Sequence, residues 1–189
     1  MKVIFLDNDG VICLATNWGT RFRKQKKVYT KENPRPLSDE IPVELRFDNF
    51  DTKAISVLNK ILEETGAEIV VSSDWKNHAN LEELGLYYES QGIIKKPIAV
   101  TPNLRDFDSD TSSMFSWKGW LERIRCLEIQ EWLKRNPNVT HWVAVDDLNM
   151  SNEYLQPGLD NFVLTPKSAE GIKQSGVKEK ILKFLNYLP

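Results

Sequence analysis

The chain has 189 residues, of which 41% are hydrophobic and 28% are charged, and its formal net charge is -2 at pH 7. This length suits one domain with a hydrophobic core, and the small net charge argues against a general affinity for nucleic acid or anionic membranes. No apolar run approaches the roughly 18 residues that a membrane helix requires, and the two cysteines form no disulfide framework. We therefore expect a cytoplasmic protein without an obligate protein partner.

Strands and helices are expected to alternate along the chain. Lys2 to Leu6 is an apolar run that predicts a buried strand, and it stops at Asp-Asn-Asp-Gly. Asp51 can cap a helix with apolar residues at helical spacing, Gly66 can end it, and residues 67–71 form a second apolar strand. Further elements are expected as helices over 79–91, 117–135 and 177–188 and as strands over 98–100, 141–145 and 161–164.

This alternation predicts a Rossmann-like, three-layer α/β/α fold with a central parallel sheet, in one domain spanning 1–189. Ligands of such sheets bind at the carboxyl ends of the strands. Three predicted strands end there in acidic or hydroxyl residues: Asp7 and Asp9, Ser72 and Ser73, and Asp146 and Asp147. The connection over about 13–50 is long and has little clear periodicity, so it is interpreted as an insertion that forms a small cap or flap.

The aspartates have the chemistry of a phosphate-handling site. Asp7 and Asp9 lie two apart at a strand end, so both can project toward one side, and Gly10 allows a tight turn. With Asp146 or Asp147 they would form the oxygen-rich cluster that Mg²⁺ prefers. A carboxylate can then attack phosphorus while a second one transfers protons. Strand-end aspartates also serve as helix caps or solvated loop residues, but three strand ends in order favour a site.

These residues resemble the haloacid dehalogenase (HAD) superfamily of hydrolases. The first motif is matched by Asp7-Asn8-Asp9-Gly10-Val11, the second by Ser72 or Ser73 after an apolar strand, and the fourth by residues 143–147. Additional sequence motifs are similar to those of the HAD domain of the Swiss Army Knife RNA repair proteins. That similarity is carried by Val71-Ser72-Ser73-Asp74-Trp75-Lys76, Thr101-Pro102, Arg125 with Glu128-Ile129, Trp132-Leu133 and Asp146-Asp147.

The resemblance implies a role for each acidic residue. Asp7 would be the nucleophile and a metal ligand. Asp9 would be the acid and base, and its backbone carbonyl would also face the metal. Asp146 and Asp147 would hold Mg²⁺ directly or through water.

The resemblance also implies partners for the phosphoryl group. One of Ser72 and Ser73 would bond to it, and Ser72 is preferred because it directly follows the apolar strand. The cation of the third motif is either Lys118 or Arg125, which lie seven apart and so near one face of the same helix. Either could instead be a surface cation over the core. Three further residues are expected to contact substrate: Gly10, Trp75 and Lys76.

The insertion combines basic and aromatic residues, namely Arg21, Arg23, Lys24, Lys26, Lys27, Lys31 and Arg35 with Trp18, Phe22 and Tyr29. Such residues can bind phosphates and stack on bases, although a solvated charged loop has the same composition. The sequence therefore predicts a Mg²⁺-dependent phosphatase that acts on a phosphomonoester, with a nucleotide or nucleic-acid end as one candidate substrate. The alternatives are a small-molecule phosphatase or nucleotidase and a non-catalytic scaffold that binds phosphorylated ligands.

Overall fold

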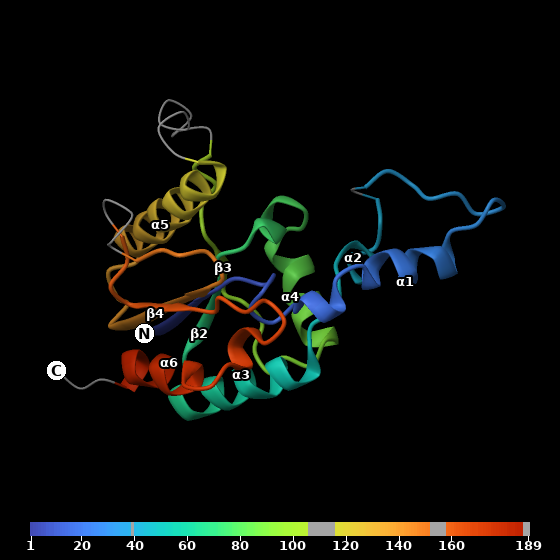
Figure 1. Cartoon of the computed structure of the whole chain (residues 1–189). Coiled ribbons are helices and arrows are strands. Elements are labelled where there is room, and N and C mark those ends of the chain that lie inside the picture. The colour runs from blue at the N-terminus through green and yellow to red at the C-terminus, as the bar shows by residue number, and fades with distance from the viewer. Residues whose placement is uncertain (39, 106–115, 152–157, 187–189) are drawn as a thin grey trace.

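The computed structural model describes residues 1–38, 40–105, 116–151 and 158–186. Within these ranges the chain forms a five-stranded sheet in the order β3-β2-β1-β4-β5 (Figure 1). Every neighbouring pair is parallel, which confirms the predicted Rossmann-like α/β fold. The strands are β1 (Lys2–Leu6), β2 (Glu68–Val71), β3 (Ala99–Val100), β4 (His141–Asp146) and β5 (Phe162–Leu164).

The last four α-helices follow the predicted alternation of strands and helices. The α-helices are α1 (Thr20–Val28), α2 (Val43–Arg46), α3 (Thr52–Thr65), α4 (Leu81–Ser90), α5 (Trp117–Arg135) and α6 (Val177–Asn186), and the short 3-10 helices are η1 (Ala15–Asn17), η2 (Asp74–Asn77) and η4 (Gly171–Lys173). Asp51 caps α3 and Gly66 ends it in the left-handed conformation, as expected. The last helix was predicted to reach residue 188, but residues 187–189 lie outside the described part of the chain.

Alternate side chains of β1 belong to two hydrophobic clusters on opposite faces of the sheet. Ile4 and Leu6 join the cluster that contains the buried residues of α3 and α6. Val3 and Phe5 join the cluster that contains Cys126, Ile129 and Trp132 of α5, where the ring of Phe5 meets Trp132 edge to face at 5.3 Å. Figure 1 shows α5 on one side of the sheet and α3 and α6 on the other. The result is the expected three-layer arrangement.

The strand register brings the predicted polar strand ends together. Leu6 of β1 pairs with Val71 of β2 and with Val145 of β4. The next residues are therefore neighbours at one edge: the Asp7 amide donates to the Val145 carbonyl at 3.0 Å, and the Ser72 amide donates to the Leu6 carbonyl at 2.9 Å.

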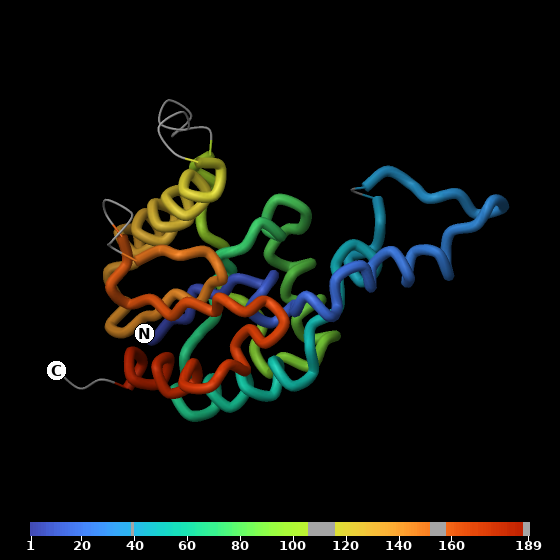
Figure 2. The backbone as a smooth tube through the Cα atoms, viewed as in Figure 1, coloured from blue at the N-terminus to red at the C-terminus, as the bar shows by residue number. Residues whose placement is uncertain are grey.

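The insertion over 13–50 contains two helices, α1 and α2, that the sequence did not predict. Helix α1 buries only Gln25, so it lacks the apolar stripe on which such a prediction depends. Polar contacts hold it instead: Asp48 accepts from the Arg21 amide at 2.7 Å and from the Thr20 hydroxyl at 3.2 Å, and Lys24 donates to the Phe47 carbonyl at 2.9 Å. Figure 2 shows this segment extending away from the sheet.

None of the described helices combines the length and the apolar content that a bilayer crossing needs.

Candidate active site

The turn after β1 brings the chain close to Asp147. The carbonyl oxygen of Asn8 accepts the amides of Val11, Ile12 and Cys13 at 2.8–3.2 Å, which folds the turn back on itself. Gly10 has φ of +71°, and a Cβ there would lie 2.7 Å from Cγ of Asp147. A glycine is thus required by the backbone conformation and by the approach of Asp147. Whether Gly10 also contacts substrate, as expected from the sequence, stays a prediction.

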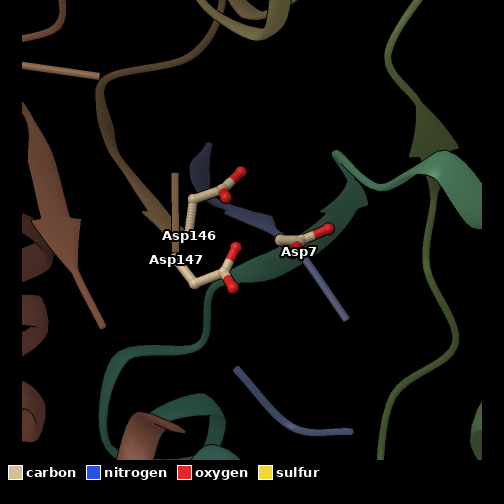
Figure 3. A group of neighbouring side chains, drawn as sticks. All are labelled: Asp7, Asp146 and Asp147. Carbon is tan, nitrogen blue, oxygen red and sulfur yellow. The ribbon is translucent and has the colours of Figure 1, made fainter. Parts of the chain in front are cut away.

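Three carboxylates meet at the carboxyl edge of the sheet (Figure 3). One oxygen from each of Asp7, Asp146 and Asp147 lies within 4.8 Å of the others. Asp7 and Asp146 are only 5% and 1% exposed, so their charges are poorly solvated. Burial, followed by the charge of Asp146, raises the pKa of Asp7 well above its usual value, and burial raises the pKa of Asp146 to about 7. The cluster therefore favours binding a cation.

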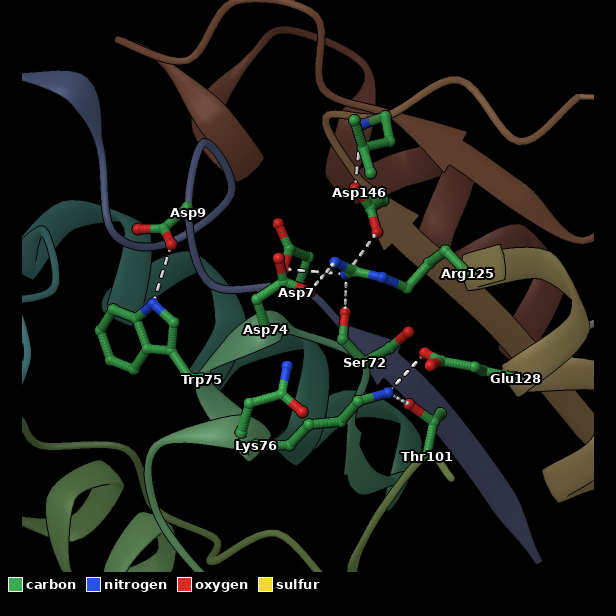
Figure 4. A network of polar contacts seen from close by, with 12 residues as sticks. Asp7, Asp9, Ser72, Asp74, Trp75, Lys76, Thr101, Arg125, Glu128 and Asp146 are labelled. Atoms are coloured by element: carbon green, nitrogen blue, oxygen red, sulfur yellow. Dashed lines mark hydrogen bonds and ion pairs between the residues drawn. The ribbon is translucent and has the colours of Figure 1, made fainter. Parts of the chain in front are cut away.

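Arg125 of α5 supplies one positive charge to this cluster (Figure 4). Its Nη1 lies 3.0 Å from Asp7 Oδ1 and 3.1 Å from Asp146 Oδ2, and it also donates to the Ser72 carbonyl. Nη2 lies 3.3 Å from Asp74. Burial alone would lower the pKa of Arg125, but the surrounding carboxylates outweigh it and raise that pKa. The guanidinium remains charged.

Lys118, the other candidate cation on α5, is placed differently. Its side chain is 69% exposed, and its ammonium lies 3.9 Å from Glu122. Its charge slightly offsets the raised pKa of Asp147, whereas burial is the main cause of that rise. Of the two cations that the sequence left open, Arg125 contacts Asp7, and Lys118 lies at the surface.

Ser72 and Ser73 are both buried after β2. The Ser72 hydroxyl oxygen has no hydrogen-bond partner among the described residues, although the carbonyl of the same residue binds Arg125. A buried hydroxyl without a partner is uncommon in native proteins. Ser72 therefore has unused hydrogen-bonding capacity beside Asp7 and Arg125.

Asp9 is turned toward Trp75, away from the acidic cluster (Figure 4). The Trp75 indole donates to Asp9 Oδ2 at 2.8 Å. Trp75 is buried and stacks on Phe47 at 4.3 Å and on Phe50 at 5.3 Å, which fixes the indole. Burial raises the pKa of Asp9, and the indole bond opposes only part of that rise. Trp75 thus orients Asp9, and its expected contact with substrate stays a prediction.

Lys76 was also expected to contact substrate, and the structure places its ammonium in a buried ion pair with Glu128. The ammonium donates to the Thr101 hydroxyl at 2.8 Å and to the Pro102 carbonyl at 2.9 Å. Sequence reasoning assigned no role to Glu128. The available signal was its spacing of three residues from Arg125, which places both side chains on one face of α5.

A comparison with protein families matches residues 3–177 to the model described as the HAD domain in Swiss Army Knife RNA repair proteins. The chain belongs to this family. No curated protein and no solved structure gave a significant match. Membership supports a HAD-type phosphohydrolase in general terms, because the match covers nearly the whole chain.

The donor set of this HAD domain fits the divalent ion that the family implies. Asp7, Asp146 and Asp147 offer hard carboxylate oxygens, which suit Mg²⁺ better than they suit softer metals. Three carboxylates also carry more negative charge than the single guanidinium of Arg125 can balance. The residues therefore fit a Mg²⁺ ion.

The HAD domain thus brings together five of the residues that the sequence singled out and leaves others apart. The residues that meet are Asp7, Ser72, Arg125, Asp146 and Asp147. Asp9 lies beside them against Trp75, whereas Lys76 is paired with Glu128 and Lys118 faces solvent.

Proposed function

We propose that this HAD domain is a Mg²⁺-dependent phosphatase that hydrolyses a phosphomonoester through an aspartyl-phosphate intermediate on Asp7. One observation carries the proposal: a buried carboxylate at the end of β1 lies against two further carboxylates and a buried guanidinium. This combination provides a nucleophile, ligands for a cation and a fixed positive charge for phosphate oxygens.

The reaction has two balanced steps. An Asp7 oxygen forms a bond to phosphorus while the bond from phosphorus to the leaving oxygen breaks, and Asp9 gives its proton to that oxygen. Asp9 then takes a proton from water, the water oxygen attacks phosphorus, and the bond to Asp7 breaks to release phosphate. The raised pKa of Asp9 suits this role, because burial helps it to hold a proton nearer neutral pH.

Arg125 and Ser72 would bind the phosphoryl oxygens, and Asp7, Asp146, Asp147 and the Asp9 carbonyl would hold Mg²⁺. When bound there, the metal reduces the repulsion between Asp7 and the phosphate dianion and stabilises charge in the transition state. Arg125 suits a planar, forked contact with phosphate better than a lysine would.

The proposed substrate is a nucleotide or a phosphorylated nucleic-acid end. The family description refers to RNA repair proteins, and the basic insertion supports a polyanionic substrate. A binding-only scaffold is the weaker reading, because such a protein would not need both Asp7 and Asp9.

The deciding experiment is phosphate release from p-nitrophenyl phosphate with Mg²⁺ or with EDTA, for the wild type and for Asp7→Asn. We expect Mg²⁺-dependent turnover that falls by at least about 10³-fold in the variant, because the nucleophile is lost. A panel of nucleotides and of 3′- and 5′-phosphorylated oligonucleotides follows. No turnover of any of these substrates would contradict the phosphatase and favour the scaffold.

A further inference from the structure

A pocket of about 260 Å³ lies between the insertion and the residues after η2. Its lining includes Arg21, Phe22, Arg35, Ile41, Arg46 and Phe47. Three of these residues are arginines, and none of the described lining residues is acidic. The pocket is therefore suited to an anionic ligand.

The positive charge of this pocket comes mainly from two of its arginines. Arg46 is engaged with Glu83, whose two oxygens lie 3.1 and 3.2 Å from its guanidinium. In the part of the chain that the structure describes, neither Arg21 nor Arg35 forms an ion pair with a carboxylate. Their charges can therefore act on a ligand.

The pocket also offers flat apolar surface. Phe22 is 53% exposed, and the Arg21 guanidinium lies 4.9 Å from the centre of its ring. Phe47 and Ile41 also line the pocket but are almost fully buried, so Phe22 is the ring that a ligand could stack on. Aromatic rings next to guanidinium groups bind a planar, negatively charged ligand such as a nucleotide, in which the base stacks and a phosphate pairs with arginine.

The pocket adjoins the acid side of the proposed active site. Phe47 lines it and stacks on Trp75 with ring planes only 6° apart, and Trp75 in turn binds Asp9. Because Asp9 would protonate the leaving oxygen, the leaving group must lie on this side.

We propose that this pocket binds the leaving group of the substrate, and that this group is a nucleotide unit. Its base would lie against the exposed ring of Phe22, and a second phosphate would pair with Arg21 and Arg35. The inference rests on the proposed phosphatase function, because it takes Asp9 as the acid. The volume of about 260 Å³ is just below the range of about 300–1,000 Å³ typical of ligand pockets, which limits the ligand to no more than about one nucleotide unit.

The pocket shares Ser38, Arg46 and His78 with a second recess of about 550 Å³. A longer chain could therefore continue beyond the first nucleotide. Free nucleotides and oligonucleotide ends share the chemistry that the pocket recognises, so the test compares both.

The first measurement is calorimetric binding of adenosine 3′,5′-bisphosphate and of inorganic phosphate to the full chain with Asp7→Asn. The substitutions Arg21→Gln and Arg35→Gln are then added to this variant. The fold-increase in Kd that they cause should be at least about ten times larger for the bisphosphate than for inorganic phosphate. The matched control, Arg23→Gln with Lys31→Gln, removes the same charge from exposed residues outside the pocket and should leave the bisphosphate Kd within about twofold. Equal effects of the two pairs would overturn the proposal.

The second measurement separates this inference from the phosphatase function. With Asp7 intact, kcat/KM is measured for p-nitrophenyl phosphate, adenosine 3′,5′-bisphosphate, ribose 5-phosphate and a 3′-phosphorylated oligonucleotide. A higher kcat/KM for the bisphosphate or the oligonucleotide that is lost with Arg21→Gln and Arg35→Gln supports leaving-group binding in the pocket. Which of the two is preferred shows whether the substrate is a free nucleotide or an oligonucleotide end. Turnover of all four substrates without such a preference contradicts leaving-group binding in the pocket but still supports the phosphatase function. If the bisphosphate binds in a way that depends on the two arginines but no substrate is hydrolysed, both the phosphatase function and the leaving-group role of the pocket are wrong. The pocket would then be a nucleotide-binding site only.

Discussion

Arg125 contacts Asp7, Asp74 and Asp146 and the backbone of Ser72 at once. These contacts need the fork of a guanidinium, because a single lysine ammonium cannot occupy all these positions. We therefore expect Arg125→Lys to lower kcat for p-nitrophenyl phosphate by about 10²-fold or more, a loss comparable to removal of one donor that stabilises transition-state charge. Steady-state kinetics at saturating Mg²⁺ measure this.

Lys118 provides the comparison on the same helix. Since its side chain is largely exposed and pairs only loosely with Glu122, Lys118→Gln should change kcat by less than about threefold. A large loss in Lys118→Gln with a small loss in Arg125→Lys would reverse the assignment of the third-motif cation.

At the scale of elements, Asp51 determines where α3 begins. Its side chain accepts from the Ala54 amide at 2.8 Å and lies 3.1 Å from the Lys173 ammonium. Burial alone would raise the pKa of Asp51, but the amide bond and Lys173 outweigh it and lower that pKa. A lowered pKa in the folded state gives stability that is present above the unfolded pKa of about 4 and is lost as the pH falls through the folded value.

Asp51→Ala should therefore lower the free energy of unfolding by about 1 kcal/mol at pH 7. The difference from the wild type should shrink below about pH 4, where the wild-type carboxylate also becomes protonated. Urea unfolding at several pH values measures it, with Lys53→Ala on the exposed side of α3 as the control. A difference that grows toward acid pH would contradict the role of the Asp51 charge.

The Lys76–Glu128 pair joins α5 to the segment after β2. Both side chains are almost fully buried, and Glu128 also accepts from the Leu104 amide at 3.2 Å. Lys76→Met leaves Glu128 buried without its ion-pair partner, so we expect a loss of about 3–5 kcal/mol in the free energy of unfolding. Adding Glu128→Leu should restore part of it, because no unpaired charge remains. Urea unfolding of the two single variants and the double variant gives the coupling energy, and additive losses would argue against the pair.

At the scale of the whole molecule, the acidic cluster links metal binding to stability. A ligand that binds only the folded state stabilises it by mass action, by about 2.7 kcal/mol at a concentration of 100 times Kd. We therefore expect saturating Mg²⁺ to raise Tm by about 5–10 °C, measured by calorimetry against NaCl of equal ionic strength. The shift should be much smaller in Asp146→Asn with Asp147→Asn. An undiminished shift in that variant would place the metal elsewhere.

The sequence by itself determined the parallel sheet and the edge at which the polar residues gather. Apolar runs such as Lys2–Leu6, the cap at Asp51 and the stop at Gly66 are local signals, and β1 and α3 match them closely. Asp7 and Ser72 directly follow β1 and β2, and Asp146 is the last residue of β4, so a parallel register brings them together at one edge of the sheet.

Only the tertiary structure decided which side chains meet across the sheet. Helical spacing placed Lys118 and Arg125 on one face, but only the packing of α5 over the strand ends brings Arg125 to Asp7, 118 residues away. The Lys76–Glu128 pair joins residues 52 apart, and the bond from Trp75 to Asp9 joins residues 66 apart. Buried charges and indole N–H groups need a hydrogen-bond or ion-pair partner where packing excludes water. The periodicity of the sequence does not predict which residue that partner will be.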